Sequence, residues 1–250
     1  MSSSSDSEIS RRAGTDDDFD ETDIDSDDSV SNIDMNFNPY EYNGGTVTGI
    51  AGEDFVVIAC DTRFSNEETV LLTEHSKLFQ LLPMAVLGST GCWADVLGFM
   101  GLVKERIQLY EQKHNKPMTT EALANMMMIA MYAKRFYPYL VLNILAGLDA
   151  NGKGMLYTYD PVGFFETVPY TAAGVAGQML MPILDNQVAF ENTNIPPEQQ
   201  PELTIKRAVS ITKDAFRTAS ERDIFTGDWV QILIITKQGI EEDSMELRHD

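Results

Sequence analysis

From Phe37 onward the chain alternates short apolar runs with turn-forming residues, whereas the preceding residues are almost entirely polar. Runs of four to eight apolar or β-branched residues between turn formers predict strands. The predicted strands cover residues 46–51, 55–60, 77–81, 84–88, 140–148, 155–160, 164–170, 229–236 and about 244–247.

Apolar residues at spacings of three and four predict four helices. These helices cover residues 94–113, 120–134, 177–188 and 204–221. In the second of them, Met126, Met127, Met128 and Met131 share the helical spacing, which predicts flexible core filler and not a cofactor surface. The order of strands, two helices, strands, two helices and strands indicates an α+β fold with antiparallel sheets and helices packed outside them.

Charge divides the chain into two parts. The 250 residues hold 39 acidic and 18 basic side chains, for a net charge of −21. Residues 1–36 contain 12 of the acids and only two bases, so we expect a disordered acidic extension there. A chain this acidic is not expected to bind nucleic acid or an anionic membrane, because both require a basic face.

Cysteine content and hydropathy indicate a soluble intracellular protein. Cys60 and Cys92 are too few for a disulfide scaffold or a metal-binding quartet, and they suit a reducing compartment. The sequence holds no run of 18 apolar residues, and the N-terminus does not have the layout of a signal peptide.

The common catalytic motifs are absent from this sequence. It has no phosphate-binding loop, no G-x-S-x-G, no H-E-x-x-H and no C-x-x-C, so neither a cofactor nor a metal is expected. His75, His114 and His249 are scattered, and a catalytic histidine is not expected among them. Gly44-Gly45-Thr46 at the start of a predicted strand, followed by Asp61-Thr62-Arg63, is more informative.

These segments and several later ones resemble the beta subunits of the proteasome. Within that family, residues 37–250 resemble a eukaryotic non-catalytic member at the sixth position of the beta ring. The matching motifs are Phe37-Asn38-Pro39-Tyr40, Asn43-Gly44-Gly45-Thr46, Gly52-Glu53-Asp54, Asp61-Thr62-Arg63, Tyr137-Pro138-Tyr139, Tyr159-Asp160-Pro161, Leu184-Asp185-Asn186 and Thr226-Gly227-Asp228. The resemblance implies a four-layer αββα sandwich of the N-terminal-nucleophile hydrolase type.

The resemblance also indicates where a catalytic site would lie. Active members use an N-terminal threonine, followed by an aspartate after 16 residues, a lysine after 32 and an oxyanion glycine after 46. Asp61, Lys77 and Gly91 all count back to position 45, which is glycine. Asp223 and Thr226 match the aspartate–serine pair of active members. The resemblance therefore implies a degenerate site whose remaining residues serve packing and hydrogen bonding, with Asp61, Arg63 and Lys77 in one polar network.

Two alternatives remain open. Thr46 could act as a nucleophile after autolysis at Gly45, although a shift of one residue along a strand turns its side chain to the opposite face. The chain could also be a free acidic interaction protein whose tail binds a basic partner.

As a non-catalytic subunit, the chain is expected in a seven-membered beta ring in the cytoplasm and nucleus. Its expected partners are other beta subunits, the alpha ring and a beta subunit of the opposite ring. Residues 1–36 would be a propeptide, trimmed near Asn36 or Phe37 by an active neighbour, and residues 37–250 the proteasome beta-type domain.

Overall fold

The computed structural model describes residues 40–66 and 69–249. The chain divides into two units, Met1–Pro39 and Tyr40–Asp250, and only the second contains described residues. The predicted acidic extension, with its expected cleavage positions Asn36 and Phe37, lies outside the described residues.

The second unit contains two five-stranded antiparallel sheets. The first sheet has the strand order β10-β1-β2-β11-β12 and the second sheet has the order β5-β6-β7-β8-β9. The strands of the first sheet are β1 (Thr46–Ala51), β2 (Phe55–Asp61), β10 (Tyr170–Gly174), β11 (Trp229–Thr236) and β12 (Gly239–Glu246). Those of the second sheet are β5 (Leu78–Leu82), β6 (Ala85–Gly91), β7 (Val141–Leu148), β8 (Gly154–Tyr159) and β9 (Phe165–Thr167). β3 (Phe64–Ser65) and β4 (Val70–Leu72) form a separate short hairpin.

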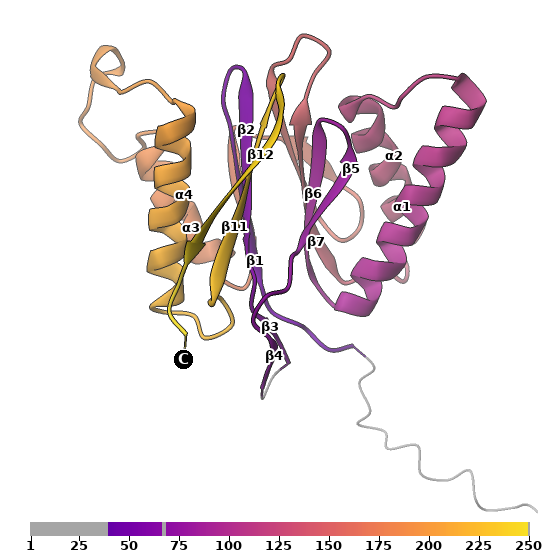
Figure 1. The fold of residues 1–250 in the computed structure, drawn as a ribbon, viewed down its shortest axis with the longest axis horizontal. Coiled ribbons are helices and arrows are strands. Elements are labelled where there is room, and N and C mark those ends of the chain that lie inside the picture. The colour runs from indigo at the N-terminus through magenta and orange to yellow at the C-terminus, as the bar shows by residue number, and fades with distance from the viewer. Residues whose placement is uncertain (1–39, 67–68, 250) are drawn as a thin grey trace, which may run out of the picture. The chain divides into compact units, whose positions relative to one another are not determined.

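Two helices lie on each side of the sheets (Figure 1). α1 (Trp93–His114) and α2 (Thr120–Tyr132) pack on the second sheet, and α3 (Gly177–Gln187) and α4 (Ile205–Ser220) pack on the first. A 3₁₀ turn, η1, covers Pro197–Gln199. The Thr119 and Thr204 hydroxyls cap α2 and α4 by accepting backbone N–H bonds.

Three apolar cores fill the spaces between the successive layers of helices and sheets. The core between the sheets contains Val47 and Ile58 from the first sheet and Ile144 and Leu156 from the second. The other two cores lie between each sheet and its helices, and Met127 and Met131 are fully buried in one of them, as their spacing predicts. The mixed helices and antiparallel sheets confirm the predicted α+β class.

The sequence-based prediction was wrong at two strands. Residues 164–170 form not one strand but two, because the chain crosses between sheets at Val168-Pro169. The Val168 N–H donates to Leu156 in the second sheet, while the Pro169 carbonyl accepts from Ala51 in the first. The last strand begins at Gly239 and not near Ser244, so its acidic residues belong to an edge strand.

Candidate functional site

The site begins where the chain enters β1. Gly44 and Gly45 precede the strand with φ angles of +71° and +88°. β1 then lies between β10 and β2, and the Gly45 carbonyl accepts a hydrogen bond from Val175 N–H at 3.1 Å. These contacts fix the direction of the backbone at positions 45 and 46.

The Lys77 side chain occupies the space beside Gly45. A Cβ atom on Gly45 would lie 2.1 Å from Lys77 Cε and 2.7 Å from its Cδ. The Lys77 side chain is buried, and its ammonium donates to the Asp61 carbonyl at 2.8 Å, the Arg63 carbonyl at 2.8 Å and Asp61 Oδ1 at 3.2 Å. Three acceptors match the three hydrogens of an ammonium group, so all of its donors are used.

Asp61 connects Lys77 to the start of β1. Its side chain is fully buried, and Oδ1 accepts the Thr46 backbone N–H at 2.7 Å in addition to Lys77. Burial raises the pKa of Asp61, while the Lys77 ammonium and the Thr46 N–H act against this increase. The predicted pairing of Asp61 and Lys77 is therefore present, and it holds a peptide nitrogen of the strand.

The Thr46 hydroxyl takes part in a different set of contacts. It lies 2.8 Å from Thr226 Oγ1 and accepts the Ala176 N–H at 3.1 Å. Because Thr226 donates its one hydroxyl hydrogen to Asp223 Oδ2 at 2.6 Å, Thr46 must donate to Thr226. The Thr46 hydroxyl thus belongs to a relay of hydrogen bonds ending at Asp223, while the Cβ position of Gly45 faces Lys77.

Gly91 lies beside the segment that leads into β1. Its carbonyl accepts the Asn43 N–H at 3.1 Å, and its φ of +121° suits glycine. A Cβ there would approach the Leu140 carbonyl oxygen to 2.3 Å. Asn43 Oδ1 also accepts a hydrogen bond from the Trp93 N–H at the start of α1, at 2.8 Å. These contacts connect the segment before β1 to the second sheet and its helices.

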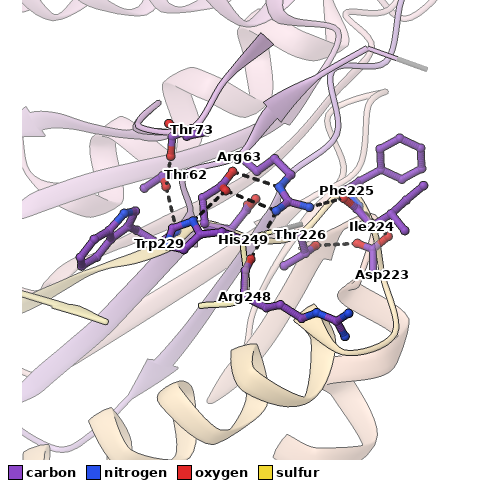
Figure 2. A network of polar contacts seen from close by, with 12 residues as sticks. Thr62, Arg63, Thr73, Asp223, Ile224, Phe225, Thr226, Trp229, Arg248 and His249 are labelled. Atoms are coloured by element: carbon purple, nitrogen blue, oxygen red, sulfur yellow. Dashed lines mark hydrogen bonds and ion pairs between the residues drawn. The ribbon is translucent and has the colours of Figure 1, made fainter. Parts of the chain in front are cut away.

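Arg63 organises the loop that contains Asp223 and Thr226 (Figure 2). Its guanidinium, only 4% exposed, bonds Asp228 Oδ2 at 3.0 Å, the Ile224 carbonyl at 2.7 Å and the Arg248 carbonyl at 3.3 Å. The sequence identified Arg63 as a network residue but not Asp228 as its ion-pair partner. The only available signal for Asp228 was its place in the Thr226-Gly227-Asp228 motif.

The structure brings all six predicted positions into one cluster. Gly45, Asp61 and Lys77 lie together; Gly91 is joined through Asn43; Asp223 and Thr226 are joined through Thr46. In the described ranges 40–66 and 69–249, no group of three His, Cys, Asp or Glu side chains is suited to hold a metal ion. The same residues include no helix with the length and apolar character to cross a membrane.

Comparison with known proteins gives the class of this fold and site. Residues 41–235 match a family model described as "Proteasome subunit". That match covers most of the chain, and the chain belongs to the proteasome subunit family.

Individual relatives indicate which kind of proteasome subunit the chain resembles. The chain is 53% identical over 214 residues to proteasome subunit beta type-1 of Drosophila melanogaster, covering 86% of this chain and 91% of that protein. It is 42% identical over 217 residues to the protein of the same name from Arabidopsis thaliana, covering 86% and 97% of the two chains. The counterpart from Danio rerio is also 42% identical, over 219 residues that cover 87% and 91%. These relatives confirm the resemblance to proteasome beta subunits read from the sequence motifs.

Proposed function

We propose that this chain is a non-catalytic structural subunit of the 20S proteasome core particle. Its role is to build the beta ring and the wall of the chamber in which active neighbours degrade protein. The observation that carries the proposal is the glycine at position 45, whose side-chain space is filled by Lys77. A glycine offers no hydroxyl, and the Gly45 nitrogen lies in a peptide bond and cannot act as a base. The Lys77 ammonium instead donates its hydrogens to Asp61 and Arg63.

The same proposal assigns the fold type and the partners. The order of layers, with a helix pair, two sheets and a second helix pair, supports an αββα sandwich of the N-terminal-nucleophile hydrolase type. The partners are other beta subunits in a seven-membered ring, the alpha ring and a beta subunit of the opposite ring, in cytoplasm and nucleus. The extension 1–36 is a propeptide that an active neighbour trims near Asn36 or Phe37.

The contacts of Thr46 weigh against the alternative, an active peptidase that uses this residue after autolysis. The Thr46 hydroxyl donates to Thr226 and accepts from Ala176, whereas the Lys77 ammonium donates to Asp61 and Arg63, so the two groups take part in separate sets of hydrogen bonds. Misplacement on the order of 1 Å can reduce a catalytic rate about 10²-fold. A hydroxyl committed to the buried hydrogen-bond relay that ends at Asp223 is therefore a poor nucleophile.

N-terminal mass spectrometry of the assembled particle tests the proposal. We expect the mature chain to begin between Met35 and Asn38, whereas a free Thr46 would establish the peptidase alternative.

A particle that carries Lys77→Ala should assemble less efficiently, yet each peptidase activity per assembled particle should stay unchanged. Loss of a single activity with normal assembly would contradict a structural role, and a stable monomer outside any large particle on sedimentation would support a free interaction protein.

A further inference from the structure

A cavity opens between the edge strand β12 and the segment that leads into β5. Its volume is about 420 Å³. β11 and β12 contribute Trp229, Gln231, Glu242 and Ser244 to its lining, and the segment before β5 contributes Glu74 and Ser76. The cavity lies outside the Lys77–Asp61 cluster, and neither the proposed function nor the relatives' names assign it a role.

A chain of hydrogen bonds crosses one wall of this cavity. The Leu78 N–H donates to Ser76 Oγ at 3.2 Å, and Ser76 Oγ donates to Gln231 Oε1 at 2.5 Å. Gln231 Nε2 then donates to Glu242 Oε1 at 2.7 Å. The chain holds one oxygen of the Glu242 carboxylate in place, and within residues 40–66 and 69–249 the other oxygen has no hydrogen-bond partner.

The backbone of Trp229 is also fixed in position. Thr62 Oγ1 accepts the Trp229 N–H at 3.1 Å and donates to the Thr73 carbonyl at 2.6 Å. Figure 2 shows the indole ring directed away from the Arg63 network. Trp229 therefore lines the cavity from a fixed backbone position.

The cavity contains negative charge that nothing in the described chain neutralises. Glu74 and Glu242 are both exposed, and within residues 40–66 and 69–249 neither carboxylate forms an ion pair. Asp243, the next residue along β12, forms an ion pair in which its Oδ2 lies 2.6 Å from Lys213 Nζ. Glu242 has no such cation among the described residues.

We propose that this cavity binds the guanidinium group of an arginine from a neighbouring subunit. A planar guanidinium can stack on an aromatic face while its N–H groups bond carboxylate oxygens, and Trp229 and Glu242 supply these two features. The two negative charges favour a cationic ligand. The Ser244 hydroxyl adds a hydrogen-bond acceptor to the lining of the cavity. The identity of the partner as a neighbouring subunit rests on the proposed function.

Titration of the full-length chain with L-argininamide tests the cavity independently of assembly. The indole N–H resonance of Trp229, assigned by its loss in Trp229→Phe, should shift with a Kd of about 1–10 mM. L-citrullinamide, in which an uncharged urea group of similar shape replaces the guanidinium, should leave it unchanged. The resonance of Trp93, which packs against His75 and Phe79, serves as an internal control.

Matched variants sharpen the titration. Glu242→Gln should weaken L-argininamide binding about fivefold to tenfold, because one charge-assisted contact is lost. Glu241→Gln should not change it, since Glu241 is paired in register with Ile234 on the other face of β12. An absent shift, or an equal shift with L-citrullinamide, would overturn the cavity as a guanidinium site. An equal response to L-lysinamide would overturn the assignment of arginine.

Photo-crosslinking in the purified assembled particle tests the source of the arginine. With p-benzoylphenylalanine at Ser244, we expect the cross-linked peptide to come from an adjoining subunit and to contain an arginine. A peptide without arginine, or no cross-link at all, would contradict the subunit assignment. Absence of the chain from the particle would instead overturn the proposed function, with the titration result unaffected.

Discussion

The Lys77–Asp61 cluster and the Trp229 cavity use charged side chains in opposite ways. In the cluster, an ammonium and a carboxylate are at most 2% exposed, and each hydrogen of the ammonium has an acceptor. At the cavity, Glu74 and Glu242 are exposed, and neither forms an ion pair with any residue that the structure describes. A closed charge set of the first kind can hold a fold together, whereas an open set of the second kind remains available to another molecule. The following predictions test this contrast, beginning with the largest effect.

Lys77→Met should cause the largest loss of stability. It leaves the Asp61 carboxylate buried without its cation, and removing one partner of a buried pair costs about 3–5 kcal/mol. The free energy of unfolding from denaturant titration measures this. Adding Asp61→Asn to Lys77→Met should restore part of the loss; a double variant as unstable as the sum of both single variants would show that the two groups act independently.

Gly45→Ala should come next. Its Cβ would overlap Lys77 in a backbone conformation that disfavours side chains, and such overpacking costs about 2–4 kcal/mol. The control is Gly98→Ala in α1, where no atom lies within 4 Å of the new Cβ. That change should stabilise the chain by about 0.5–1 kcal/mol, since alanine favours helix. Equal melting temperatures for the two variants would refute the view that Lys77 fills the site.

Thr226→Val should have a moderate effect. It removes the hydroxyl that joins Thr46 to Asp223 and should cost about 1–2 kcal/mol of unfolding free energy through unmet hydrogen bonds. Thr218→Val on the exposed face of α4 serves as the isosteric control. If both variants unfold at the same denaturant concentration, the relay is not a stabilising element.

Neutralising the cavity should barely change stability. Glu74→Gln with Glu242→Gln should alter the unfolding free energy of the isolated chain by less than about 0.5 kcal/mol, as expected for exposed positions. A loss comparable to that of Lys77→Met would place the cavity charges among the supports of the fold and erase the contrast.

Two histidines should show small and opposite pH effects. Partial burial, with help from Lys77, lowers the pKa of His75 below 6.5, so its contribution to stability falls as the pH drops below about 6.5. Hydrogen bonds to Glu246 and Asp228 raise the pKa of His249, so its contribution is complete below pH 6.5 and is lost as the pH rises through the higher pKa. NMR titration of the two imidazoles checks both signs; the same pKa for both rings would contradict the prediction.

Local pattern was enough to predict most of the fold. β1 and β11 have the predicted bounds, because each is a run of β-branched or apolar residues between turn formers. The crossing at Val168-Pro169 was missed because apolar residues flank it, although a proline inside a strand-like run is a signal against one continuous strand. Most of β12 was not predicted, because a run of charged residues on an edge strand has the polar character of a loop. The run here is Glu241, Glu242 and Asp243.

The candidate site was only partly accessible to sequence. The spacing of catalytic residues in active proteasome beta subunits, applied to this sequence, predicted Gly45, Asp61 and Lys77 as site positions. The structure brings these three residues together. The Arg63–Asp228 pair and the Thr46–Thr226 contact join residues 165 and 180 positions apart, and nothing in local pattern specifies them. The Trp229 cavity was not predicted, because its walls come from chain segments that lie far apart in the sequence.

The packing of Lys77 against Gly45 also has an evolutionary consequence. A threonine introduced at position 45 would meet the Lys77 side chain before it gained any catalytic use, so this substitution alone is disfavoured. A nucleophile at this position would require the side chain at 45 and the course of Lys77 to change together. Under the proposed structural role, the packing of Lys77 against Gly45 therefore makes catalytic activity hard to acquire by single substitutions.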